Sequence, residues 1–383
     1  MTGTGAVQAA GSGHSERFIA LDSLRGLAAV VVVLFHIGDF GWLAGIPMMR
    51  NGWLLVDFFF ILSGFVITMS YGGRLAKGFP KGRFLALRAG RVLPLHYAVL
   101  AVMLLLQLAV FGPVLHERHN WGEFWRSLFL LDAFRPHTGN WFSPVSWTLA
   151  VEMVLYVLAA ALFGRGWLGI AATALLAGAA ALCLWTDTNP PVFGSLLQRG
   201  VLGFGLGVGA YALHRRCRAI EPGTTILTLL ELALLAAIVA TLVWVPVSRV
   251  SVLTVDTVFL PAVLVFARDG GLVSRVLHAR PLEVLGRLSF AIYMTHLFLV
   301  VGFNRALPFV LRAMGRPDLV VTQGRTTFGL SSVELGQPAE TALTLVILVL
   351  VLGLGWLAWR FVEEPARQRS RALIGPASPL PQN

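Results

Sequence analysis

The chain has 383 residues, of which 56% are hydrophobic and only 13% are charged, and its formal net charge is +11. A soluble globular domain carries about 25% charged residues, and the mean hydropathy here is +0.76, so we exclude an ordinary soluble fold. In a membrane protein a basic balance indicates arginines in cytoplasmic loops rather than a nucleic-acid partner. The two cysteines, Cys183 and Cys217, form no CxxC motif, so neither a disulfide framework nor a metal site is predicted.

Long apolar stretches recur along the chain. A bilayer core of about 30 Å requires roughly 20 apolar residues per helix. We therefore predict an all-α, polytopic membrane protein of about ten transmembrane helices. The predicted spans are 18–37, 53–72, 92–112, 147–164, 167–186, 200–213, 224–244, 250–267, 288–304 and 341–361.

Short segments flank the predicted membrane domain, which covers residues 17–368. Residues 1–16 contain no Lys or Arg and therefore do not resemble a cleavable signal peptide. We expect disordered cytoplasmic tails at 1–16 and 369–383, and we expect the first hydrophobic segment to stay in the mature protein.

The positions of the basic residues predict the orientation. If the N-terminus is cytoplasmic, most of the 30 basic residues fall on the cytoplasmic side, from Arg17 before the first span to Arg371 after the last. The positive-inside rule therefore predicts that both termini are cytoplasmic. We expect a multi-pass protein of the inner (plasma) membrane.

Two long outer segments, 113–146 and 305–340, are where a partner at the outer face is expected to be held. The first contains Trp121, Trp125 and Trp141. These residues are interpreted as an interfacial aromatic belt or, alternatively, as a stacking surface for a sugar ring.

The first predicted span contains Asp22, Arg25 and His36. Charges inside a bilayer are costly, so each is a candidate functional residue. Arg25 and His36 are eleven residues apart, which places both on one helix face with about 16 Å between them along the axis. Asp22 lies one turn before Arg25 and is expected to pair with it. The alternative is structural, with Arg25 snorkelling inward and His36 at the interface.

Acidic and histidine residues in other spans extend this pattern. Glu152 is expected about 7 Å inside the outer end of the fourth span, close to the predicted depth of His36. A carboxylate near a histidine orients the imidazole and stabilises its charged form, so the two form a candidate dyad for activating a hydroxyl. Alternatively, Glu152 pairs with an arginine for structure alone. Asp57, in the outer half of the second span, is expected to have a structural role or to support the site. His296, near the midplane of the ninth span, is expected to be a packed, hydrogen-bonded histidine or to line a tunnel.

Arg88 and Arg91 lie one turn apart before the third span, at its predicted cytoplasmic entrance. Arginine matches phosphate oxygens well, so these residues are candidates for holding the phosphates of a donor. The positive-inside rule explains them almost as well.

Six motifs occur in a fixed order. They are Arg25 and His36 separated by ten residues; D-x-F-F-x-x-S-G-F at 57–65; Arg88 and Arg91 followed by VLP; SW-x-L-x-x-E at Ser146, Trp147, Leu149 and Glu152; S-x-x-x-Y-x-x-H at Ser289, Tyr293 and His296; and E-x-P at Glu363 and Pro365. Together they resemble the acyltransferase family 3 membrane proteins, which include O-antigen and other cell-envelope O-acetyltransferases.

The resemblance covers about residues 17–368 and implies a ten-helix domain that transfers acyl groups from acyl-CoA to sugars or similar acceptors. It implies acyl-CoA, most commonly acetyl-CoA, as donor substrate, and we expect no permanently bound cofactor and no metal. Many relatives carry a further soluble domain after the helices. This sequence stops shortly after Pro365, so acceptor recognition is expected from the helices, the outer loops or a partner.

The resulting hypothesis is a membrane-bound O-acyltransferase. Acyl-CoA docks on the cytoplasmic side with its phosphates near Arg88 and Arg91, and its acyl arm passes Arg25. His36 then takes a proton from a hydroxyl of a carbohydrate or glycoside acceptor near the outer face, while Glu152 orients His36. An acyl-His36 intermediate is an alternative. Supporting or substrate-binding roles are expected for Asp22, Asp57, Ser146, Trp147, Tyr293 and His296.

Two other classes of function are alternatives. A transporter or flippase of a glycan or lipid-linked substrate would use the buried charges as a path, but it predicts two matching halves, and no internal repeat is evident. A non-catalytic scaffold or sensor predicts that changes to His36 and Glu152 are silent. The lipid bilayer is a partner in every case.

Overall fold

The computed structural model of this chain describes residues 18–38, 40–43, 45–111, 120–135, 142–320 and 333–374. The expected tail at 1–16, Arg17, Trp141 and the last part of the expected C-terminal tail lie outside the described residues. Within these ranges the regular structure is helical, apart from one isolated antiparallel bridge between Val320 and Val333.

The helices follow one another along the chain with short 3₁₀ and π segments between them. The α-helices are α1 (Ile19–Ile37), α2 (Leu55–Ile67), α3 (Gly73–Ala76), α4 (Lys81–Phe111), α5 (Trp121–Leu128), α6 (Ser146–Leu162), α7 (Trp167–Trp185), α8 (Ser195–Arg216), α9 (Thr224–Trp244), α10 (Val250–Phe266), α11 (Leu272–Leu277), α12 (Arg280–Ala313), α13 (Gln337–Ala358) and α14 (Glu364–Ile374). The 3₁₀ segments are η1 (Gly41–Leu43), η2 (Pro47–Leu54), η4 (Leu131–Phe134), η5 (Phe163–Arg165) and η6 (Pro317–Leu319), and the π segments are η3 (Thr68–Gly72) and η7 (Trp359–Glu363).

Nine helical segments in the described part of the chain are long and apolar enough to cross a membrane, and the apolar α10 is slightly shorter. These ten elements follow the ten predicted spans in the same order. The prediction of an all-α, polytopic membrane protein is therefore confirmed.

Several helices extend beyond the predicted apolar windows. α4 begins at Lys81, directly after Pro80, so Arg88 and Arg91 lie inside a helix and not in a connection before it. α8 and α12 are likewise longer at both ends than predicted. The reason is that a hydropathy window detects only the apolar part of a helix, whereas Arg, Lys, Leu and Ala favour continuing the helix beyond it.

The C-terminal helix also differs from the expectation. α14 continues to Ile374, past residue 369, where the sequence predicts the start of a disordered tail. Its first turn is held by Glu364, which accepts hydrogen bonds from Arg367 and Gln368. Because α14 also packs against α4, these residues are part of the folded domain.

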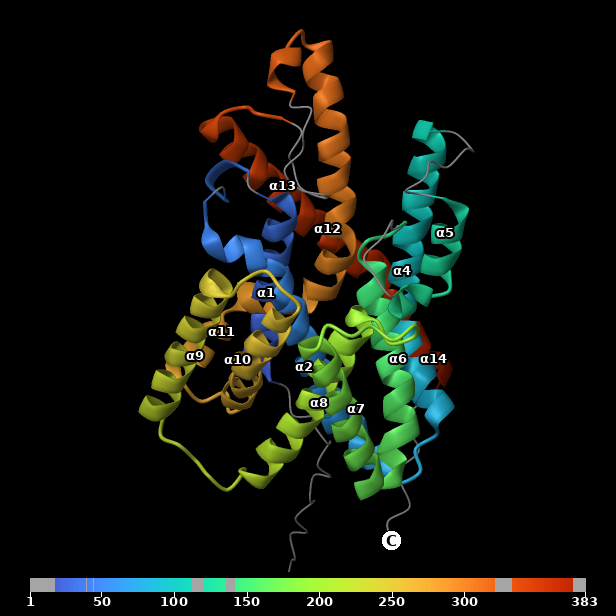
Figure 1. The fold of residues 1–383 in the computed structure, drawn as a ribbon, viewed down its shortest axis with the longest axis vertical. Helices are drawn as coiled ribbons and strands as arrows, with labels where there is room; N and C mark the ends of the chain where they lie inside the picture. Colours follow the sequence, from blue (N-terminus) through green and yellow to red (C-terminus); the bar gives the residue numbers. More distant parts are fainter. Residues whose placement is uncertain are drawn as a thin grey trace, which may run out of the picture.

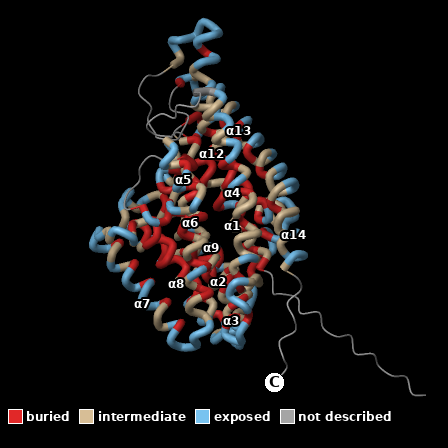
Figure 2. Tube along the Cα trace, turned by 90° about the vertical axis from the view of Figure 1, so that its right-hand side faces the viewer, coloured by how far each residue is buried: buried red, intermediate tan, exposed pale blue. Residues whose placement is uncertain are grey.

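α1, α2 and α8 form the centre of the helix arrangement. Figure 1 shows α9, α10 and α11 on one side of this centre and α4, α6 and α14 on the other. α1 packs on α12, and α2 packs on α8. Buried residues are concentrated on these inner helices (Figure 2), whereas α9 buries only Leu227, Glu231 and Leu242. An apolar helix with so few buried residues is typical of one that faces lipid.

Two glycines allow α1 and α12 to approach closely. A Cβ atom added at Gly26 would lie 2.6 Å from the backbone nitrogen of Gly286, and one added at Gly286 would meet the backbone of Asp22. Small residues permit such close helix crossings in membranes. The crossing brings the face of α1 that carries Arg25 and His36 against the face of α12 that carries Ser289 and His296.

Candidate active site

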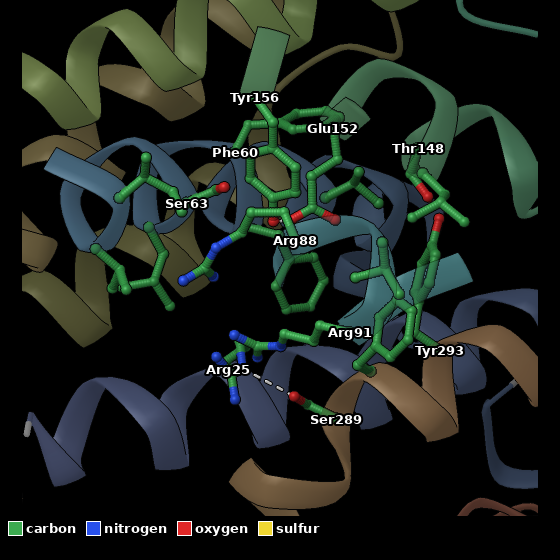
Figure 3. A pocket seen from close by; sticks show the side chains of 18 residues that line it. Arg25, Phe60, Ser63, Arg88, Arg91, Thr148, Glu152, Tyr156, Ser289 and Tyr293 are labelled. Atoms are coloured by element: carbon green, nitrogen blue, oxygen red, sulfur yellow. Dashed lines mark hydrogen bonds between the residues drawn. The ribbon is translucent and has the colours of Figure 1, made fainter. Parts of the chain in front are cut away.

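A cavity with an empty volume of about 920 Å³, including the part open at its mouth, lies between α1, α2, α4, α6 and α12. Much of its wall is apolar and comes from α2, including Phe59 and Phe60. Figure 3 shows the polar side chains that point into it. The charged residues of the wall are Arg25, Arg88, Arg91 and Glu152.

Arg25 is held in place by three groups. Its Nε donates a hydrogen bond to the Ser289 hydroxyl (2.8 Å), and its Nη2 donates to the carbonyl oxygen of Gly286 (2.9 Å). Its Nη1 lies 3.5 Å from the Asp22 carboxylate, as the helix spacing predicts. The close crossing at Gly26 therefore fixes the direction in which the guanidinium points into the cavity.

Arg91 and Arg88 come from successive turns of α4. Figure 3 shows the guanidinium groups of Arg91 and Arg25 side by side, and the two cations interact electrostatically. The guanidinium carbon of Arg88 lies 4.7 Å from the ring centroid of Tyr71 and 5.9 Å from that of Tyr156. The Nε of Arg88 is buried and has no hydrogen-bond partner among the described residues. Donors are therefore available for an anion in the cavity.

Glu152 lies on the same side of the cavity as Arg88 (Figure 3). It accepts a short hydrogen bond from the hydroxyl of Tyr156, one turn later in α6, and it interacts electrostatically with Arg25 and Arg88. His36 is not among the residues that line this cavity. The structure thus groups Glu152 with the arginines, whereas the sequence-based dyad places it beside His36.

Both π segments border the arginine cluster formed by Arg25, Arg88 and Arg91. Tyr71, which contacts Arg88, lies in η3. Glu363, which is buried and interacts electrostatically with Arg91 and Arg25, ends η7. π segments are often found at functional sites, and here each brings one side chain towards the arginines.

His36 and His296 form a pair farther along α1 and α12. Their rings lie 4.9 Å apart between centroids, and Nε2 of His296 lies 3.2 Å from Nδ1 of His36. His296 is fully buried, whereas His36 is partly exposed. His36 is therefore the more accessible member of the pair.

The hydrogen bonds define the tautomers of both neutral rings. Nδ1 of His296 lies 2.7 Å from the carbonyl oxygen of Tyr293, and Nδ1 of His36 lies 2.8 Å from that of Val32. A carbonyl oxygen only accepts, so each Nδ1 carries the hydrogen. Nε2 of His296 then accepts from the His36 Nδ1–H. The second nitrogen of His36, Nε2, bears a lone pair and is the basic atom.

Tyr293 connects the cavity to the histidine pair. Its side chain lines the cavity, with its hydroxyl beside Thr148 (Figure 3). Its ring centroid lies 5.6 Å from that of His296. Ser289, Tyr293 and His296 follow one face of α12, so this face runs from Arg25 to His36.

Asp57 lies in a buried ion pair behind the cavity wall. Arg199 of α8 donates to both carboxylate oxygens of Asp57, at 3.0 and 2.7 Å. The Arg199 guanidinium also stacks on Trp53 and Trp147, with distances of 4.7 and 5.4 Å to the ring centroids. These contacts support the structural role for Asp57 and give Trp147 the same role.

Ser146 belongs to a second polar network, at the start of α6. Its hydroxyl donates to the Asp132 carboxylate (2.5 Å), which also accepts from Ser127 and Arg135. Burial raises the pKa of the Asp132 carboxyl, and the hydrogen bonds from Ser146 and Ser127 oppose that shift. Because Nε2 of His96 donates to the carbonyl of Ser127 (3.0 Å), the network ties α5 to α4 and α6.

Comparisons with known proteins agree with this architecture. The acyltransferase 3 family model, described as an acyltransferase domain, matches residues 18–374. "Protein 2 in picA locus" of Rhizobium radiobacter is 36% identical over 154 residues, which cover 38% of this chain and 74% of that protein. The putative peptidoglycan O-acetyltransferase YrhL of Bacillus subtilis (strain 168) is 27% identical over 162 residues, which cover 38% of this chain but only 23% of that protein.

No solved structure is significantly similar to the chain. The family match nevertheless spans almost the whole membrane domain, from α1 to the end of α14. The protein therefore belongs to the acyltransferase 3 family and is a multi-pass membrane acyltransferase.

Proposed function

We propose that the protein is an O-acyltransferase of the inner membrane that moves an acyl group, most simply acetyl, from acyl-CoA at the cytoplasmic face to a hydroxyl of a sugar or glycosylated acceptor at the outer face. The observation that carries the proposal is that one pair of helices, α1 and α12, joins a cation-lined cavity to a histidine with a basic Nε2. The name of the Bacillus relative, a putative O-acetyltransferase, supports the choice of an oxygen acceptor.

The positive charge of the cavity wall supports acyl-CoA as the donor. Its wall contains three arginines and a single glutamate, which suits the phosphates of CoA because guanidinium groups bind phosphate oxygens in a bidentate manner. The apolar wall formed by α2 suits the uncharged pantetheine arm. The carboxylate of Glu152, which is held by Tyr156, lies among the cavity arginines and limits the repulsion between them.

The transfer step uses His36 as general base. Its Nε2 takes the proton from the acceptor hydroxyl as the oxygen attacks the thioester carbonyl carbon. The carbon–sulfur bond then breaks, and the CoA sulfur takes the proton back from His36. The products are the acyl ester and CoA thiol, so atoms and charges balance.

The second histidine stabilises the cation that forms on His36. The imidazolium keeps donating from Nδ1 to the carbonyl of Val32 and to Nε2 of His296. Because both acceptors are already in place, little reorganisation is needed when charge develops.

The test is a gene deletion in the natural host, complemented with wild type, His36→Ala or His278→Ala. His278 is an exposed histidine that pairs with Asp269, so it serves as the matched control. Mass spectrometry of envelope glycans and secreted glycosides is expected to show one acyl mass that wild type and His278→Ala restore and His36→Ala does not. Equal restoration by His36→Ala would refute the base assignment. An unmodified product that accumulates on one side of the membrane would favour a transporter instead.

A further inference from the structure

A second group of arginines, here called the rim arginines, lies outside the cavity wall around the ring of Tyr71, which also contacts the wall residue Arg88. The guanidinium carbon of Arg74 lies 5.2 Å from the Tyr71 ring centroid and 4.2 Å from that of Phe79. Arg371, on α14, interacts electrostatically with Tyr71 and with Arg91. Tyr71 thus borders both rim arginines, Arg74 and Arg371, and also Arg88 inside the cavity.

A close contact between two helices positions Arg371. The Ser370 side chain fills the space in which Gly90 of α4 would otherwise carry a Cβ atom. Gly90 is the neighbour of Arg91, and Ser370 is the neighbour of Arg371, so the contact brings these two arginines together. α14 packs on α4, and Figure 1 shows the two helices side by side, so Arg371 lies on a helix next to the one that carries Arg88 and Arg91.

The rim cluster carries more positive charge than its acids balance. Glu364 is already paired with Arg367, which donates two hydrogen bonds of 2.7 and 2.8 Å to its carboxylate. Neither Arg74 nor Arg371 forms an ion pair with a residue in the described ranges. Arg371 and Arg91 repel each other, and a bound anion removes such repulsion.

We propose that the rim arginines Arg74 and Arg371 bind the 3′-phosphate of CoA, while Arg88 and Arg91 bind its pyrophosphate. CoA carries these two anionic groups at different positions of one ribose, and the chain presents two groups of arginines that both border Tyr71. This assignment rests on the proposed acyl-CoA donor and makes α14 a determinant of donor specificity.

The test compares the binding of CoA and 3′-dephospho-CoA to the purified full-length protein in detergent. Wild type is expected to bind CoA about tenfold more tightly, the effect of one charge-assisted hydrogen-bond set. Arg371→Gln should lower the affinity for CoA by about the same factor. Its affinity for 3′-dephospho-CoA should stay within about twofold of wild type. Arg371→Lys keeps the charge and should recover part of the difference, whereas Arg369→Gln, on an exposed position of the same helix, should behave as wild type.

The possible outcomes distinguish a failure of the 3′-phosphate subsite from a failure of the proposed acyl-CoA donor. If wild type binds both ligands equally, or if Arg371→Gln weakens both by the same factor, the 3′-phosphate assignment is wrong while the acyl-CoA donor stands. If wild type binds neither ligand, the proposed donor and the subsite both fail. Arg88→Gln provides the contrast, because loss of a pyrophosphate contact should weaken both ligands.

Discussion

Nε2 of the fully buried His296 lies 3.2 Å from Nδ1 of the partly exposed His36. Each ring also directs its own Nδ1 to a backbone carbonyl of its own helix. The backbone therefore determines which nitrogen of each neutral ring carries the hydrogen. Orientation of a catalytic imidazole by a second group is commonly the task of a carboxylate, and in the proposed mechanism a neutral histidine takes that place.

The first prediction concerns this second group. His296→Leu removes one of the two acceptors of the His36 Nδ1–H and should lower kcat by about 10²-fold, the lower end of the range for the contribution of a general base. His296→Gln offers an amide oxygen in a similar position and should retain most of kcat. The measurement is the acyl-transfer rate in membranes, with the acceptor identified by the deletion experiment. Equal kcat values for the Leu and Gln variants would show that His296 only fills space.

The second prediction concerns the buried pair behind the cavity. Arg199→Gln leaves Asp57 buried without its partner and should reduce the free energy of unfolding by about 3–5 kcal/mol. Asp256 is also buried near this pair, but neither of its carboxylate oxygens has a hydrogen-bond partner among the residues that the structure describes. Asp256→Asn should therefore cost less than about 1 kcal/mol, because no hydrogen bond is lost. Unfolding midpoints in detergent compare the two variants, and equal losses would contradict the assignment of Asp57 as the partner of Arg199.

Much of the helical architecture follows from the sequence because lipid requires long apolar helices. Helix ends are less predictable, since polar residues continue a helix beyond its apolar part, as Lys81 to Arg91 do in α4. Arg199 illustrates the cost of this error. It lies one residue before the predicted span 200–213, so its position inside the helix α8 and its role with Asp57 were missed.

Contacts within one helix were predictable, whereas contacts between helices were not. The spacing of Asp22 and Arg25 correctly predicts their pairing. His36 and His296 are 260 residues apart in sequence, and periodicity does not reveal which helix faces meet. The expected partnership of His36 with Glu152 relied on depth counted from helix ends. That argument ignores lateral position, which places Glu152 in the wall of the arginine cavity.

The third prediction concerns the hydroxyl that holds Glu152. Tyr156→Phe removes the hydrogen bond to Glu152 and leaves the carboxylate free to bind Arg88, with which it already interacts. Because Glu152 then competes with donor phosphates, CoA should bind several-fold more weakly, a change of about 1 kcal/mol. Titration of CoA into the detergent-purified variant measures this change. Tyr211→Phe, which keeps its ring contact with Phe65, is the control and should bind CoA as wild type does.

The fourth prediction concerns the crossing of α1 and α12. Gly26→Ala forces a methyl group against the backbone of Leu285 and Gly286, so the helices must separate and the hydrogen bond from Arg25 to Gly286 is lost. We expect a loss of about 1–3 kcal/mol in stability from overpacking, together with weaker CoA binding because Arg25 no longer points into the cavity. Gly353→Ala in α13 is the matched control, since nothing lies within 4 Å of an added Cβ atom there, and alanine should stabilise that helix slightly. Thermal unfolding and CoA titration of both variants test the two effects separately. A Gly26→Ala protein with wild-type stability and affinity would mean that α1 and α12 do not meet at these glycines, and the register that joins Arg25 to Ser289 and His36 to His296 would have to be abandoned.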